Sequence, residues 1–115
     1  MKAESMKKEK IEIDIGRQFS RLPAGRTPKD GKFCGETFRE KFLKDPLKRS
    51  QEIRIFLDNV LSYGSSFLEE AFGGLVRVYN IKVAKFDDLV ELVTEDPFLR
   101  AEIYQYMKSA EREVQ

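Results

Sequence analysis

The stretch "EIRIFLDNVLSYGSSFLEEAFGGLVRVYN", residues 52–80, decides the fold of this chain. It opens with Ile53 and Ile55 alternating with polar residues, a pattern typical of a strand with one buried face. Residues 65–79 then repeat apolar side chains at steps of three and four, which predicts an amphipathic helix. Asn80 is suited to end that helix, because asparagine tolerates the left-handed backbone found there. The stretch therefore predicts a strand, a loop and a helix.

The same two patterns recur on both sides of this stretch. We expect further strands at 10–16 and 87–94, and helices at 35–50 and about 97–112. Pro46 should end or kink the first of these helices, and Asp96 followed by Pro97 is suited to start the last one. Strands that alternate with helices imply crossover connections. The sequence thus predicts an α/β fold with a small, largely parallel or mixed sheet.

The chain of 115 residues is sized for one domain, which we place at residues 10–112. Residues 1–9 are charged and are expected to form a flexible, solvated N-terminal arm. They lack the apolar core of a secretory signal, and no apolar run approaches the roughly 20 residues that span a bilayer. We therefore expect a protein without a membrane span.

The residue types present restrict the chemistry. The sequence has no histidine and one cysteine, Cys34. Histidine-assisted nucleophiles and zinc sites are therefore not expected, and neither is an internal disulfide. A lone cysteine suits a reducing compartment, so we expect a cytoplasmic protein. We predict no catalytic residues, no metal and no cofactor.

The net charge of +1 conceals an asymmetry between the two halves. Residues 1–50 hold 14 basic and 8 acidic residues, a balance of +6, whereas residues 51–115 hold 7 and 12, a balance of −5. Because the halves offset each other, bulk charge gives little support for nucleic-acid binding.

The connection at residues 17–35 is long and rich in Gly, Pro, Arg and Lys. Connections of this length are usually functional or mobile. Parallel strands end at one edge of the sheet, where ligands of open α/β sheets bind, so this loop and residues 59–66 should be neighbours. The candidate residues for binding an anion or a partner are Arg17, Arg21, Arg26, Lys29, Lys32, Tyr63 and Gly64. The alternative is a solvated loop that Asp30 and Glu36 partly neutralise.

Two adjacent serines open the predicted helix at 65–79. Ser66 and Glu69 have the spacing of a capping box, in which the serine caps the helix and the glutamate reaches back to the cap amide. A capping box uses one serine, so Ser65 is left for another role. It follows Gly64 in a turn where its hydroxyl could face solvent.

Three segments together resemble a known family: "FSRLPAGRTPKDGKFCGETFREKFL", "IRIFLDNVLSYGSSFLEEAFGGLVR" and "VELVTEDPFLRAEIYQYM". They are similar to the STAS-like domain family of unknown function, small prokaryotic and phage-borne proteins sometimes found beside or fused to histidine-kinase-like ATPase modules. The resemblance covers about residues 10–107. It implies the fold of the bacterial anti-sigma factor antagonists, in which the first serine of an Asp-Ser-Ser-Gly turn is phosphorylated by a kinase, releasing a partner. Ser65 matches that serine, although Gly64 stands for the aspartate and Phe67 for the glycine.

These observations lead to one functional expectation and two alternatives. We expect a non-enzymatic, regulatory partner-switching module that binds a protein, such as a histidine-kinase-like ATPase, with Ser65 as its phosphorylation site. The first alternative is a domain that binds a small anion or nucleotide with the basic loop and the same helix N-terminus. The second is a phage-encoded inhibitor of a host system. The sequence leaves the oligomeric state open.

Overall fold

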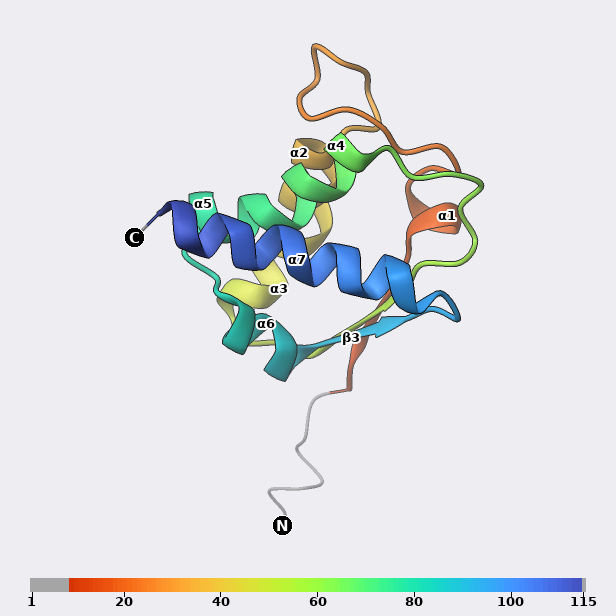
Figure 1. Ribbon diagram of the computed structural model, residues 1–115. Coiled ribbons are helices and arrows are strands. Elements are labelled where there is room, and N and C mark those ends of the chain that lie inside the picture. The colour runs from red at the N-terminus through yellow and green to blue at the C-terminus, as the bar shows by residue number, and fades with distance from the viewer. Residues whose placement is uncertain (1–8, 115) are drawn as a thin grey trace.

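The computed structural model describes residues 9–114 and has the expected α/β architecture (Figure 1). Strands β1 (Ile11–Asp14), β2 (Ile53–Phe56) and β3 (Val90–Val93) form a three-stranded sheet in the order β1-β2-β3. Both pairings are parallel, with Ile13 beside Ile55 and Ile55 beside Leu92. All three strands therefore end at one edge of the sheet, which we call the carboxyl edge.

One face of the sheet is packed and the other is open. Ile13, Ile55 and Leu92 are buried beneath the helices, which lie together on that side of the sheet (Figure 1). On the opposite face Arg54 lies 3.1 Å from the carboxylate of Glu12 and 3.0 Å from that of Glu91. The alternation of apolar and charged residues along each strand produces these two faces.

The first crossover is a continuous run of helical turns. It comprises α2 (Gly35–Phe38), the π-helical turn η2 (Arg39–Leu43) and α3 (Lys44–Lys48). The helix does not end at Pro46 but continues to Lys48. Proline lacks an N–H, and its ring crowds the carbonyl four residues back, which strains a helix at that point. The change from π- to α-helical bonding occurs just before Pro46, at this strained position.

The second crossover supplies the central helix of the molecule. It consists of α4 (Ser65–Leu68), the π-helical turn η3 (Glu69–Gly73) and α5 (Gly74–Tyr79), and therefore spans the predicted residues 65–79. Asn80 ends it in the left-handed conformation, with φ 56°, as predicted. Residues 71–76 are all buried. The central helix is thus mostly covered by its neighbours.

The prediction of a strand over 87–94 is wrong in its first half. Residues Val83–Leu89 form helix α6, and the strand begins only at Val90. Phe86 explains the helix, since its buried ring contacts Phe72 and Tyr104 at ring-centre distances of 5.8 Å. In this helix Phe86 is buried, and the adjacent aspartates of "FDDL" are exposed.

Helix α7 (Pro97–Glu113) completes the helical layer, packing against the central helix and α6. Asp96 caps it, accepting hydrogen bonds from the amides of Phe98 and Leu99 at 2.9 and 3.3 Å. The start signal predicted at Asp96 and Pro97 is confirmed. No helix within residues 9–114 is long and apolar enough to cross a membrane.

The expected arm at residues 1–9 falls mostly outside the described residues. Glu9 is described, and its carbonyl accepts a hydrogen bond of 2.9 Å from the side-chain amide of buried Gln51. Glu9, just before β1, is therefore hydrogen-bonded to Gln51, just before β2.

Candidate functional site

Two loops meet at the carboxyl edge, as the parallel topology predicts: the long first loop, which follows β1, and the second loop, which follows β2. The amide of Leu61 donates to the carbonyl of Arg21 at 2.8 Å, and the amide of Gly64 donates to that of Pro23 at 3.1 Å. Gly16, in the short helix α1 (Ile15–Gln18) that follows β1, is closer still to the second loop. A side chain at Gly16 would place its Cβ 1.9 Å from the carbonyl oxygen of Asn59. The residues after β1 and those after β2 therefore form one continuous surface.

Aromatic rings hold the long first loop against the helices. The ring of Phe19 lies between 5.3 and 6.1 Å from the rings of Phe33, Phe38, Phe42 and Phe67. Phe38 and Phe67 come from the two crossover helices and are fully buried. The first loop has no regular strand, but this contact fixes its base.

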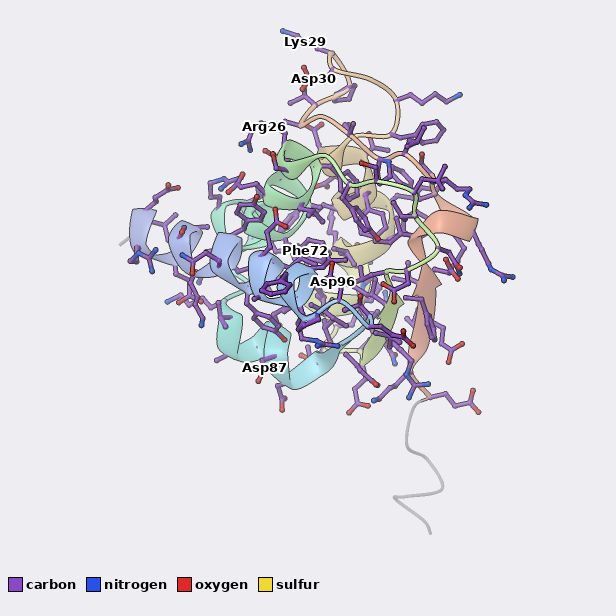
Figure 2. All side chains as sticks on the ribbon, turned by 45° about the vertical axis from the view of Figure 1, so that its right-hand side comes forward. Arg26, Lys29, Asp30, Phe72, Asp87 and Asp96 are labelled. Atoms are coloured by element: carbon purple, nitrogen blue, oxygen red, sulfur yellow. The ribbon has the colours of Figure 1, made fainter. Side chains whose placement is uncertain are left out.

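The tip of the first loop is a tight turn closed by Asp30. Its carboxylate accepts hydrogen bonds from the amides of Arg26 and Thr27 at 2.9 and 3.1 Å. These amides, Thr27 first, lower the pKa of Asp30 below its ordinary value. Gly25 has a φ of 89°, a backbone conformation that favours glycine. Figure 2 shows Lys29 at the outer end of this turn and Arg26 nearer the helices.

The predicted capping box at Ser66 and Glu69 is wrong. The helix is capped by Gly64, so Ser65 and Ser66 are already its first two residues, and no side chain caps it. A serine inside the first turn has helical backbone angles, whereas a capping residue requires an extended conformation. Glu69 is directed to arginines instead. The hydroxyl group of each serine is therefore available for another interaction.

A hollow of about 590 Å³ opens directly over the serines. Its lining residues are Gly25, Arg26, Asp30, Gly64, Ser65 and Ser66. The first three come from the loop after β1 and the others from the start of the central helix. Ser65 is exposed and Ser66 is half-buried. The hollow therefore combines a helix N-terminus, a guanidinium group and a carboxylate.

Arg26 connects this hollow to a network of ion pairs. Its guanidinium lies 2.5 Å from Glu69 and 3.6 Å from Glu70. Arg77 also pairs with Glu69, at 2.6 Å. Burial opposes ionisation of Glu69, but the hydrogen bonds from Arg77 and Arg26 outweigh it and lower the pKa of the carboxyl group. These bonds fasten the tip of the first loop to the central helix.

Arg39 extends the network into the interior. It is 4% exposed, and its Nη1 donates to the carbonyl and the carboxylate of Glu70, each at 2.8 Å. Both π-helical turns lie here, one starting at Arg39 and the other at Glu69. π-Helical turns occur frequently at functional sites. Arg39, Glu70 and Arg77 were not among the residues predicted from the sequence.

The adjacent glycines of the central helix were the one available signal for this network. A Cβ at Gly74 would lie 2.2 Å from Nη1 of Arg39, and one at Gly73 would lie 2.6 Å from Oε2 of Glu69. The glycines thus leave room for charged side chains between the helices. Glycine inside a helix costs about 1 kcal/mol relative to alanine, so its presence indicates a close contact.

The other predicted basic residues are spread around the first loop. Arg17, on α1, lies 3.5 Å from Asp14 and does not line the hollow over the serines. Arg21, Lys29 and Lys32 have no carboxylate of residues 9–114 within 4 Å. Of the predicted cations, Arg26 alone lines the hollow over Ser65. The structure therefore does not gather the basic residues into one anion site.

Tyr63 faces inward. Its hydroxyl donates to the carbonyl of Leu57 at 2.7 Å, and its ring stacks on that of Phe67 at 6.2 Å. Burial, together with the carboxylates of Asp58 and Asp14, raises the pKa of Tyr63 above its ordinary value. Tyr63 supports the second loop and is not an exposed ligand-binding residue.

Comparison with known protein families matches residues 35–97 to the STAS-like domain of unknown function. The matched region is just over half of the 115 residues and contains both crossovers and the serines. The chain belongs to the STAS-like domain family of unknown function. The match to this STAS-like family begins after the basic part of the first loop, so it includes Arg39, Ser65 and Glu69 but not Arg26. No curated protein and no solved structure matches the chain.

Proposed function

We propose that this STAS-like domain is a non-enzymatic regulatory module that binds a partner protein and is switched by phosphorylation of Ser65. The observation that carries the proposal is the position of Ser65, which is exposed at the first turn of the central helix and lines the same hollow as Arg26. An exposed hydroxyl beside a cation is accessible to a kinase, and its phosphate would have a counter-charge nearby.

A phosphate at Ser65 would change the electrostatics of the hollow. It adds about −1.5 to −2 charges, which a helix N-terminus stabilises. It would compete with Glu69 for Arg26, the group that now fastens the loop tip. It would also repel the carboxylate of Asp30, which closes the turn. Both effects act on the first loop, so the modification would alter the shape as well as the charge of the edge.

The exposed surface supports binding at the carboxyl edge. The central helix is buried over residues 71–76, which leaves its Ser65 end and a short stretch near Val78 accessible. The outer sheet face carries ion pairs among its own residues. The lone cysteine adds a cytoplasmic setting to the proposal, and the resemblance to the STAS-like family adds a histidine-kinase-like ATPase as partner.

A second candidate function is binding of a small anion or nucleotide in the same hollow. Arg26 and the first-turn amides favour it, whereas Asp30 and the existing pairs of Arg26 with Glu69 and Glu70 oppose it. A bound ligand stabilises the folded state in proportion to the logarithm of its concentration. Melting curves with inorganic phosphate and with ATP would detect such a ligand.

The direct test of the proposed modification is phosphopeptide analysis of the protein isolated from its native host. Ser62 and Ser66, on the same peptide, serve as internal comparisons. We expect phosphate on Ser65 in a fraction of the molecules. A protein that binds its partner but is never phosphorylated at Ser65 would be a plain adaptor, and the switch would be rejected.

A further inference from the structure

We propose that the carboxyl edge binds a protein segment that combines apolar and acidic side chains, through a surface formed by Leu22, Phe33, Leu61, Arg21 and Lys32, here called the docking edge. The inference rests on the proposed function in one respect, namely that the partner is a protein. It adds the chemistry of that partner and the surface that binds it.

The docking edge has an exposed apolar part. The exposed fractions of Leu22, Phe33 and Leu61 are 61%, 39% and 69%. The segments that carry them are joined by backbone hydrogen bonds, from Leu61 to Arg21 and from Ala24 to Phe33. These bonds bring the three segments side by side at the carboxyl edge, and the Phe33 ring, although partly exposed, also packs against Phe19. Grouped exposed apolar residues mark interaction sites.

The charge of the docking edge determines what it can bind. Residues 17–33 contain five basic residues and one acidic residue, and the carboxylate of that acidic residue, Asp30, is hydrogen-bonded within its own turn. Within residues 9–114, Arg21 and Lys32 have no carboxylate at ion-pair distance. The ammonium of Lys32 lies 5.4 Å from the centre of the Phe33 ring, beside the apolar set. A complementary segment carries acidic residues around apolar ones.

An anionic membrane would share part of this chemistry, but the rest of the edge disfavours it. Asp14 is the last residue of β1, and Asp58 follows β2 at the same edge. A flat anionic surface pressed onto the edge would approach these carboxylates, whereas a protein segment can lie along the first loop and avoid them. We therefore assign the docking edge to a protein.

This assignment gives a physical reason for the direction of the switch that the resemblance to the antagonists implies, namely release on phosphorylation. Ser65 follows Gly64, whose amide is bonded to Pro23 next to Leu22. A phosphate there adds negative charge beside a surface that binds an acidic segment. Phosphorylation at Ser65 should therefore release the partner.

The test is selection of a displayed library of random 12-residue peptides against the full chain, followed by measurement of Kd for the enriched peptides. We expect enriched sequences to combine apolar residues with Asp or Glu. Leu61→Asp and Arg21→Glu should each weaken binding by about tenfold or more, as substitutions in a binding centre do. Val78→Asp and Lys85→Glu place the same changes on exposed positions elsewhere and should alter Kd by less than about twofold.

Several outcomes would overturn the assignment. These are enrichment of basic peptides, no enrichment, or binding that Leu61→Asp leaves unchanged. Vesicles of phosphatidylserine and phosphatidylcholine provide the other arm, and capture by vesicles that Leu61→Asp abolishes would show a membrane surface instead. The two proposals fail separately. If phosphorylation releases a partner whose binding Leu61→Asp leaves unchanged, only the docking edge is rejected. If acidic peptides bind the phosphorylated and the unmodified protein equally, only the switch is rejected.

Discussion

Arg26, at the tip of the first loop, pairs with Glu69 in the central helix, 43 residues further along the chain. The same guanidinium lines the hollow over Ser65. The guanidinium that holds the loop against the helix is therefore also the cation of this hollow that a phosphate on Ser65 would attract. This relationship links the state of the serine to the position of the loop.

The first prediction concerns this fastening. Arg26→Met should increase amide hydrogen exchange across residues 22–34, because the loop tip loses its bonds to Glu69 and Glu70. Since Arg26 is partly exposed, the free energy of unfolding should fall by only about 0–1 kcal/mol. Arg21→Met, on the same loop, is the control and should leave exchange unchanged. Equal exchange in both variants would show that the aromatic contacts of Phe19 alone hold the loop.

The second prediction compares Asp96, which caps a helix, with Ser66, which has the sequence spacing of a capping box but caps no helix. Asp96→Ala should cost about 0.5–2 kcal/mol of unfolding free energy, because Asp96 accepts two amide hydrogen bonds. Ser66→Ala should cost less than about 0.5 kcal/mol, because Ser66 lies inside the helix and caps nothing. Urea unfolding of the two variants checks both values. A loss at Ser66 as large as that at Asp96 would restore the capping box.

The third prediction concerns the paired glycines. Gly74→Ala should destabilise the protein by roughly 1–3 kcal/mol, because its Cβ would crowd the buried guanidinium of Arg39. Gly73→Ala should be neutral or stabilising by up to about 1 kcal/mol, because its Cβ meets the ends of Glu69 and Arg77, which can move. Thermal and urea unfolding measure the difference. Similar effects at both positions would contradict the assigned role of Gly74.

The fourth prediction follows from the lowered pKa of Glu69. Its folded-state pKa lies below the unfolded value, so its ion pairs stabilise the fold above the unfolded pKa, and this contribution is lost as the pH falls through the folded pKa. Arg77→Met should therefore be less stable than the wild type near pH 6, and the difference should shrink on acidification to about pH 2.5.

Lys85→Met provides the control for that pH series, because Lys85 has no carboxylate of the described residues within 4 Å. Its stability difference from the wild type should not depend on pH over the same range. A difference for Arg77→Met that stays constant or grows in acid would show that Arg77 stabilises the fold by packing alone.

Local sequence patterns predicted the features of this fold that depend on neighbouring residues alone, namely strand alternation and helix ends. The alternation around Ile13 and Ile55 identified two strands, and Asn80 and Asp96 marked helix ends through backbone preferences of their own. Helix α6 was missed because the burial of Phe86 against Phe72 depends on a packed partner rather than on spacing.

The candidate site was less predictable for the same reason. The predicted parallel topology placed the two loops at one edge, and the apolar periodicity of residues 65–79 placed Ser65 at a helix start. The partners of Glu69 were not predicted, because the capping-box spacing favoured Ser66. Arg26 comes from a distant segment, and Arg77 lies eight residues further along the same helix. The residues around Tyr63 have the composition of a surface loop, yet its hydroxyl donates a hydrogen bond inward to the carbonyl of Leu57. Long-range side-chain pairing is what the linear pattern omits.

The most direct test of the central claim compares the protein in two charge states. Ser65→Glu and Ser65→Ala variants would each be used to capture partners from the native host, with the wild type beside them and the captured proteins quantified by mass spectrometry. We expect the wild type and Ser65→Ala to retain the same protein partner and Ser65→Glu to retain about tenfold less of it, because the added charge opposes an acidic partner. Equal capture by all three would contradict a switch at Ser65.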